Sequence, residues 1–73
     1  MQENGKQNRI ITVQGYYKNL TKKEKSKMLL HLCSRYGYMQ NTIRTKISGV
    51  NPLRDYELRD CEETISNEQE WRI

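Results

Sequence analysis

The strongest constraint on the fold of this chain is a set of helix start and stop signals between residues 21 and 49. Thr21 and Glu24 fit the S/T-x-x-E pattern, in which the threonine hydroxyl and the glutamate carboxylate each accept a backbone N–H bond at the start of a helix. Gly37 can adopt the left-handed conformation that ends such a helix, and Gly49 can end the next one. The sequence therefore predicts a helix over 21–36, a tight turn, and a short helix over 39–48.

These two predicted helices differ in the apolar surface that they offer. In the first helix, apolar residues three and four apart form one amphipathic stripe, which consists of Met28, Leu29, Leu32, Cys33 and Tyr36. The second helix offers only Ile43 and Ile47 to the interior. Its other side chains are mainly amides, hydroxyls and cations. The second helix is therefore a weak core element with an outer face rich in hydrogen-bonding groups.

A third helix is expected after Gly49. Asn51 is a favourable N-cap, and Pro52 suits the first helical position because its missing amide costs no hydrogen bond there. Asp55 and Glu57 would then lie near the positive end of the helix dipole. We expect the apolar side of this helix to consist of Leu53, Tyr56, Leu58, Cys61 and Ile65.

The two ends of the chain predict little helix. Residues 1–8 are polar and are expected to be disordered. Residues 9–14 are rich in β-branched side chains and stop at Gly15, which predicts a short strand. This strand could pair with the C-terminal tail, residues 68–73, or with its twin across a dimer. Trp71 is costly to expose, so we expect it to pack on the helices or to pair with the strand.

The predicted architecture is therefore mainly α, with three helices and a short N-terminal β-strand in one domain over residues 9–73. Only about 60% of the unfolded surface is buried in a domain of this size. Hydrophobic residues make up 34% of the chain, which is low for a globular domain. Both features favour stabilisation by dimerisation or by a bound partner.

Charge is distributed unevenly along the chain. Residues 1–50 carry ten Lys or Arg against two acids, a net charge of +8. Residues 51–73 carry three Arg against seven acids, a net charge of −4, so the whole chain has +4. A basic part and an acidic part indicate an oriented molecule, with one face for a polyanion and one for water or a protein partner.

Catalytic and metal-binding patterns are not found. Cys33 and Cys61 are 28 residues apart without C-x-x-C pairing, and we expect them to be free thiols that act as small hydrophobic residues. The single histidine, His31, lies between two leucines of a predicted helix. No nucleophile–base pair or glycine-rich phosphate loop occurs, so we expect no enzyme activity, cofactor or metal. No run of 18 apolar residues and no signal-peptide pattern occurs, which predicts a cytoplasmic protein without membrane contact.

The order of helix, glycine turn, short polar helix, glycine and capped helix resembles the DNA-binding domain of the phage lambda repressor and Cro family. Residues 40–49, QNTIRTKISG, look like the recognition helix of that family, which begins with glutamine and ends with a polar residue and glycine. Residues 50–56 continue the resemblance, Cys33 falls at the small-residue position where the two helices meet, and Gly37 falls at the turn glycine. The resemblance covers roughly residues 28–65. It implies a helix-turn-helix fold and sequence-specific binding of double-stranded DNA, as a regulator of the kind that phages and mobile elements encode.

Three positions depart from the pattern of the family. A separate long helix normally precedes the motif, where residues 9–14 here predict a strand. Lys46 occupies a usually apolar position, so its stem is expected to lie along the core while its ammonium group points outward. Met39 stands where a hydroxyl-bearing N-cap is usual.

Site residues follow from the resemblance and from the outward face of residues 39–48. The resemblance implies that Gln40 contacts a base edge, and a glutamine amide can pair bidentately with adenine. Asn41, Arg44 and Thr45 share the outward face and are predicted to contact bases, although Arg44 suits a phosphate if it lies higher on the groove wall. The residues predicted to contact phosphates are Lys22, Lys23, Thr42, Lys46 and Ser48. A homodimer on a near-palindromic site is expected, because one small module reads few base pairs.

Two alternatives remain open at this stage. In a ribbon-helix-helix protein the strand over residues 9–14 would enter the groove, with Arg9, Thr12 and Gln14 as readers. A helix-turn-helix protein without DNA affinity could instead bind a protein partner. Its surface would combine the acidic C-terminal third with the tyrosines at 16, 17, 36, 38 and 56.

Overall fold

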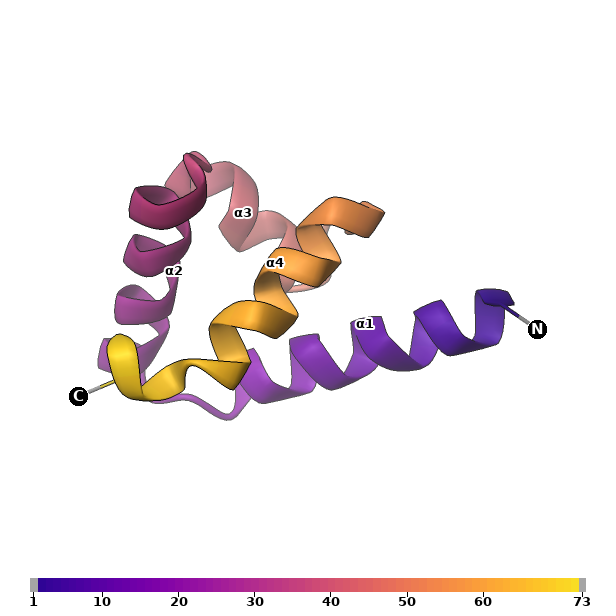
Figure 1. Ribbon diagram of the computed structural model, residues 1–73, viewed down its shortest axis with the longest axis horizontal. Coiled ribbons are helices and arrows are strands. Elements are labelled where there is room, and N and C mark those ends of the chain that lie inside the picture. The colour runs from indigo at the N-terminus through magenta and orange to yellow at the C-terminus, as the bar shows by residue number, and fades with distance from the viewer. Residues whose placement is uncertain (1, 73) are drawn as a thin grey trace.

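The computed structural model describes residues 2–72, which form four α-helices and one short 3-10 helix (Figure 1). The elements are α1 (Gln2–Lys18), α2 (Lys22–Tyr36), α3 (Gln40–Ile47), α4 (Asp55–Ser66) and η1 (Glu68–Glu70). Helix α1 runs along one edge of the molecule, and its N-terminal turns project beyond the other helices (Figure 1). Within this part of the chain no helix is long and apolar enough to cross a bilayer. The mainly α prediction is confirmed.

The predicted strand over residues 9–14 is wrong, because these residues lie in the middle of α1 and residues 2–72 contain no β-strand. Val13 and Tyr17, four apart, are both buried, and Ile10 packs against the same core. A spacing of three and four places these side chains on one helical face, which outweighs the β propensity of the segment. Residues 2–8, expected to be disordered, form the first turns of α1. A long helix therefore precedes α2 after all.

Helix α2 begins and ends as predicted. The Glu24 backbone N–H donates to the Thr21 hydroxyl at 3.2 Å, and the Thr21 N–H donates to the Glu24 carboxylate at 3.0 Å. At the other end Gly37 has φ of 79°, and its N–H donates to the carbonyl of Cys33 at 3.0 Å. A left-handed residue reverses the chain direction cheaply only when it lacks a Cβ. This conformation allows only three residues to separate the end of α2 from the start of α3.

Helix α4 begins later than predicted. Its first residue is Asp55, and the N-terminal boundary lies at Arg54 instead of Asn51. The backbone N–H groups of Val50 and Asn51 both donate to the carbonyl of Thr45, at 2.9 and 3.1 Å. The backbone of these residues therefore closes the end of α3, and α4 begins only after Arg54. Leu53, which precedes α4, is buried in the core.

The core draws on all four helices. Its buried apolar residues are Val13, Tyr17, Leu20, Met28, Leu29, Leu32, Ile43, Ile47, Leu53, Leu58, Cys61 and Trp71. Ile43 and Ile47 supply all the buried residues of α3, as the sequence predicted. Tyr56 was expected on the apolar side of the third helix, but it is 49% exposed and stacks on the ring of Tyr38.

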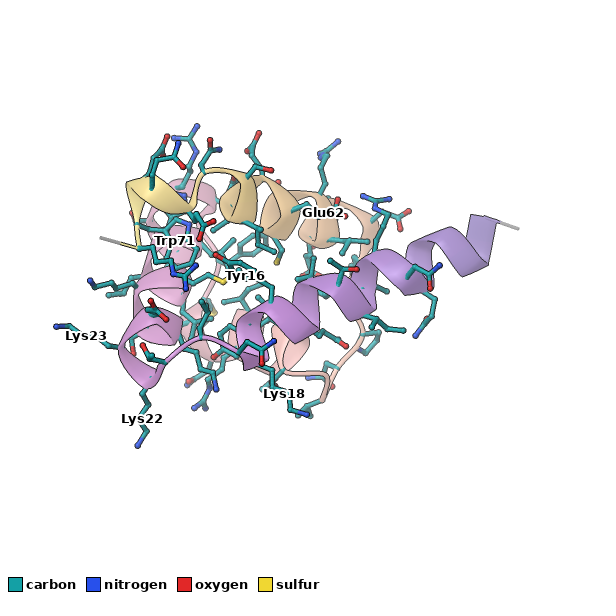
Figure 2. All side chains as sticks on the ribbon, turned by 90° about the horizontal axis from the view of Figure 1, so that it is seen from below. Tyr16, Lys18, Lys22, Lys23, Glu62 and Trp71 are labelled. Carbon is teal, nitrogen blue, oxygen red and sulfur yellow. The ribbon has the colours of Figure 1, made fainter. Side chains whose placement is uncertain are left out.

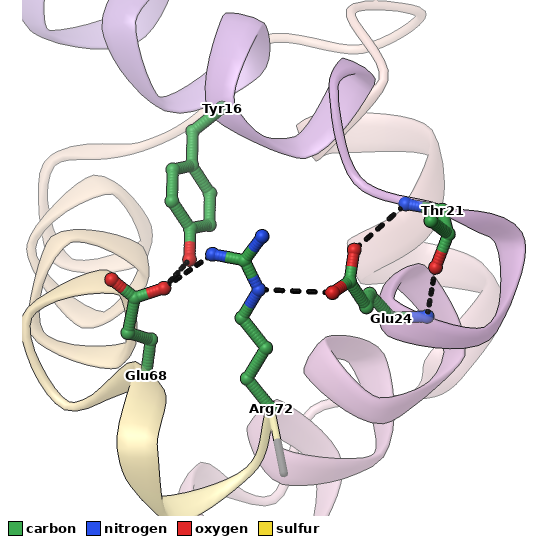
Figure 3. A network of polar contacts seen from close by, with 5 residues as sticks. All are labelled: Tyr16, Thr21, Glu24, Glu68 and Arg72. Carbon is green, nitrogen blue, oxygen red and sulfur yellow. Dashed lines mark hydrogen bonds and ion pairs between the residues drawn. The ribbon is translucent and has the colours of Figure 1, made fainter.

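Trp71 packs on the helices, which was one of its two predicted positions. Its indole N–H donates to the carbonyl of Thr64 at 2.8 Å, and its ring meets the edge of Tyr16 at 6.5 Å between centroids. The tail forms η1 instead of the strand considered for it. Arg72 then bridges two carboxylates, those of Glu24 on α2 and Glu68 in η1, and Glu68 also accepts a bond from the Tyr16 hydroxyl (Figure 3). This network attaches the C-terminal end of the described chain to α1 and α2.

A buried ion pair joins α3 to α4. The carboxylate of Glu57 is almost completely buried and accepts hydrogen bonds from the Lys46 ammonium group and, at 2.8 Å, from the Arg54 N–H. The carbonyl of Lys46 also accepts a bond from the side-chain amide of Gln14 on α1. The ammonium group was expected to point outward, but it turns to Glu57. A carboxylate that leaves water needs a cationic partner and hydrogen-bond donors.

Lys46→Met should destabilise the fold by about 3 kcal/mol, because it leaves the Glu57 carboxylate buried without its cation. Adding Glu57→Gln to that variant should restore much of the loss, since the glutamine side-chain carbonyl still accepts the Arg54 N–H. Urea denaturation followed by circular dichroism measures both changes. Equal losses in the single and double variants would contradict this role of the pair.

The Arg72 network should make the fold sensitive to acid. The pKa of Glu68 is lowered mainly by its bond from Arg72, and that of Glu24 by the Thr21 N–H and then by Arg72. The ionised carboxylates stabilise the fold above their ordinary pKa of 4.5, and this contribution is lost as the pH falls through the lowered values. Arg72→Gln should therefore weaken the pH dependence of the free energy of unfolding below pH 4.5. Arg59→Gln, which removes a cation from outside the network, should leave this dependence unchanged.

Candidate nucleic-acid interface

Helix α3 presents a polar face to solvent. Gln40, Asn41, Thr42, Arg44 and Ser48 are exposed on it or just after it. No ion pair within residues 2–72 involves Arg44, and no side-chain bond occupies Gln40 or Asn41. Met39 supplies no side-chain cap, as its lack of a hydroxyl implies. Amide groups in the first turn of α3 and a guanidinium group in its last turn are thus available to an external ligand.

Thr45, predicted to contact a base, is less available than these residues. Its side chain is half-buried and its hydroxyl donates to the carbonyl of Thr42 at 2.8 Å. The same hydroxyl accepts a bond from the Asn51 side-chain amide at 3.2 Å. Because both bonds are internal, the hydroxyl of Thr45 is less available to an external ligand. The hydroxyl of Ser48 donates to the carbonyl of Thr45 at 3.3 Å.

Among the predicted phosphate contacts, two lysines are exposed and one is not. Lys22 and Lys23 lie in the first turn of α2 with exposed side chains, and no contact within residues 2–72 occupies them. In Figure 2 they extend from the molecule near Lys18, the last residue of α1. Lys46, in contrast, is held on Glu57 and has only 18% of its side chain exposed. The structure therefore places Lys18, which the sequence did not single out, on the same side of the molecule as Lys22 (Figure 2).

The acidic residues of the C-terminal third contact groups of the protein itself. Glu62 on α4 forms an ion pair with Arg9 of α1 at 2.6 Å, on the opposite side of the molecule from Lys18 and Lys22 (Figure 2). Three tyrosine hydroxyls also donate to carboxylates, in the pairs Tyr16–Glu68, Tyr36–Glu63 and Tyr38–Asp60. The pKa values of these tyrosines are raised, first by burial and then by the bonds to the carboxylates. The negative charge is therefore used largely within the fold, while the exposed lysines of α2 keep their positive charge available.

Tyr17 differs from these three tyrosines, and it was not among the predicted site residues. Its ring is buried, but no group within residues 2–72 forms a hydrogen bond with its hydroxyl. The ammonium group of Lys25, from α2, lies 5.4 Å from the centre of its ring. Tyr17 and Lys25 belong to different helices, so no spacing along the sequence could have indicated that they meet.

The surroundings of the two cysteines and of the single histidine are also defined among the described residues. Both cysteines are free thiols; Cys61 is buried and Cys33 half-buried. The part of the chain that the structure describes contains no group of three or more potential metal ligands. His31 is half-buried and meets the ring of Tyr36 edge-on.

Comparisons with known proteins give no match: no protein-family model, no curated protein and no solved structure matches this chain.

The two thiols should react very differently. Burial raises the pKa of Cys61 to about 12, so very little thiolate is present at neutral pH. Iodoacetamide at pH 8 should modify Cys33 in the folded protein and Cys61 only after denaturation, as read by mass spectrometry. The Cys33→Ser variant should show no modification while folded. Rapid modification of that variant would contradict the packing of Cys61 against the core.

Proposed function

We propose that this protein is a sequence-specific regulator that binds double-stranded DNA with α3 in the major groove. The observation that carries the proposal is the exposed polar face of α3, held by a glycine turn against α2. A recognition helix needs this arrangement, because it must pack by one side and leave hydrogen-bonding groups on the other. Ile43 and Ile47 supply the packing, while Gln40, Asn41 and Arg44 remain available.

The arrangement of α1, α2 and α3 supports this proposal. Residues 37–39 separate α2 from α3, within the range of helix-turn-helix motifs, and Gly37 has a positive φ. Helix α3 turns sharply away from the end of α2 (Figure 1). The long α1 lies where the lambda repressor and Cro family has a helix, so the main topological departure from that family disappears.

Residue roles follow from exposure. Gln40 and Asn41 would contact base edges from the first turn of α3, and the methyl group of Thr45 would suit a thymine methyl. The backbone phosphates would be held by Lys22, Lys23, Thr42 and Ser48. Lys46, predicted as a phosphate contact, would instead act by fixing α3 against α4 through Glu57.

Two copies on a near-palindromic site would provide the affinity that one small module lacks. The strand suggested as a dimer element does not exist in the described residues, so a dimer would use another surface. Such a regulator would act in the cytoplasm of a bacterial or phage-infected cell.

The two alternatives lose support. The ribbon-helix-helix alternative required a strand at residues 9–14, but these residues are helical. Two of its predicted base-contacting residues also have partners within the protein, because Arg9 pairs with Glu62 and Gln14 bonds to the carbonyl of Lys46. A protein-binding surface made of tyrosines and acids is weakened because Tyr16, Tyr36 and Tyr38 already bond to such acids. Failure of the protein to retain DNA would return the protein-binding alternative to first place.

Selection from a random duplex library tests the proposal. The bound fraction should yield a motif with two half-sites about one helical turn apart. Gln40→Ala and Asn41→Ala should each reduce discrimination at one position of the half-site by about 1–3 kcal/mol. Arg59→Gln, on the exposed side of α4, is the matched control and should keep the motif.

Two results would count against the proposal. Retention of duplex without any motif, with affinity that falls steeply in salt, would indicate backbone binding without sequence readout. No retention at low salt would exclude DNA as the ligand.

A further inference from the structure

We propose that Tyr17, Lys25 and Arg44 form one binding site for a phosphodiester group of duplex DNA, at the junction of α1, α2 and α3. This inference rests on the proposed function and assigns a role to each of the three side chains. Tyr17 and Lys25 were not predicted as site residues. Arg44, predicted first as a base contact, becomes a backbone contact.

The geometry of Tyr17 is the starting point. Its ring is 7% exposed and belongs to the core, so its position is well defined by packing. Its hydroxyl has no hydrogen-bond partner within residues 2–72, although it is not a fully buried unsatisfied group. It therefore reaches the surface as an available donor. Tyr16, Tyr36 and Tyr38 differ, because each donates to a carboxylate of α4 or η1.

Two cations from other helices approach this tyrosine. Lys25 on α2 has its ammonium group 5.4 Å from the centre of the ring, a cation–π distance. Arg44 lies on α3, which packs on α1. Burial raises the pKa of Tyr17, and the positive charge of Arg44 lowers it. The guanidinium group is therefore close enough to Tyr17 to influence its hydroxyl.

No carboxylate of the described chain neutralises these two cations. Arg9, Lys46 and Arg72 each form an ion pair with a glutamate, whereas Lys25 and Arg44 form none within residues 2–72. Positive charge that no acid of the described chain neutralises can be offset by an external anion. A hydroxyl donor with cations nearby suits a phosphate oxygen.

The position of Arg44 on α3 favours the backbone over the bases. In a helix, residues three and four apart share a face, so Arg44 lies next to Gln40 and Asn41 on one side and next to Ser48, a predicted phosphate contact, on the other. Arg44 directly follows the buried Ile43, and its positive charge acts on Tyr17 of α1. Lys18 directly follows Tyr17, and Lys22 lies about one helical turn before Lys25 on α2 (Figure 2). Both lysines would extend the basic surface along the DNA backbone.

Salt titration of DNA affinity tests the site, with the variants Tyr17→Phe, Lys25→Gln and Arg44→Gln. Arg44→Gln should lower the slope of log affinity against log salt by about 1. Adding Lys25→Gln to this variant should change the slope little more, because both cations bind the same phosphate. Tyr17→Phe should weaken binding about tenfold with the slope unchanged, since it removes a donor but no charge. Arg59→Gln removes the same charge from α4 and should change neither the slope nor, by more than about twofold, the affinity. Melting temperatures of all variants check that each is folded.

Sequence preference separates this role from base reading. The motif selected by Arg44→Gln should equal that of the unaltered protein, with affinity reduced uniformly over all sequences. A change of preference at one base pair would assign Arg44 to a base and overturn the proposal. Equal behaviour of Arg44→Gln and Arg59→Gln would also overturn it.

The failure of this inference can be distinguished from that of the proposed function. If Gln40→Ala and Asn41→Ala lose preference while Arg44→Gln matches Arg59→Gln, the function stands and the phosphate site falls. If the unaltered protein retains no duplex at low salt, both fall. Titration with inorganic phosphate, followed by NMR, should give at most millimolar binding. Free phosphate that binds as tightly as duplex would replace DNA as the ligand of this site.

Discussion

The buried carboxylate of Glu57 is the contact on which the position of α3 depends. It accepts the N–H of Arg54 at the start of α4 and the ammonium group of Lys46 near the end of α3. The carbonyl of Lys46 in turn accepts a bond from Gln14 of α1. A helix with only two buried apolar side chains gains little from hydrophobic packing. The ion pair and its hydrogen bonds therefore supply much of what orients α3 against α1 and α4.

The distribution of charge on the surface depends on which carboxylates bind groups of the protein itself. The carboxylates of α4 and η1 bind tyrosine hydroxyls and arginines from the other helices, so they act as internal connectors. The lysines at the start of α2 and Arg44 on α3 have no such partners within the described chain. The molecule thus retains positive charge on the side that we propose faces DNA. The net charge of +4 for the whole chain does not show how unevenly positive charge is distributed between the two sides of the molecule.

Local signals in the sequence were reliable where one short motif controls one backbone event. The Thr21–Glu24 box and Gly37 act through hydrogen bonds within a few residues, so they needed no information about the rest of the fold. The buried pair Ile43 and Ile47 likewise follows from spacing alone. Residues 9–14 were assigned wrongly because their β-branched side chains suit a strand locally, whereas the core face of α1 extends beyond that window to Tyr17. Asn51 and Pro52 form a good helix start in isolation, but the end of α3 uses the backbone there.

The sequence by itself determined the mainly helical class, the capped α2, the glycine turn and the polar face of α3, because these depend on side-chain spacing and local hydrogen bonds. Only the tertiary structure decided which helix precedes the motif, where the Lys46 ammonium group points, and which acids are neutralised internally. It alone also placed Tyr17 and Lys25 together. These outcomes depend on contacts between segments far apart in the chain. Burial of a charge or a ring is set by what packs against it, and local pattern does not contain that information.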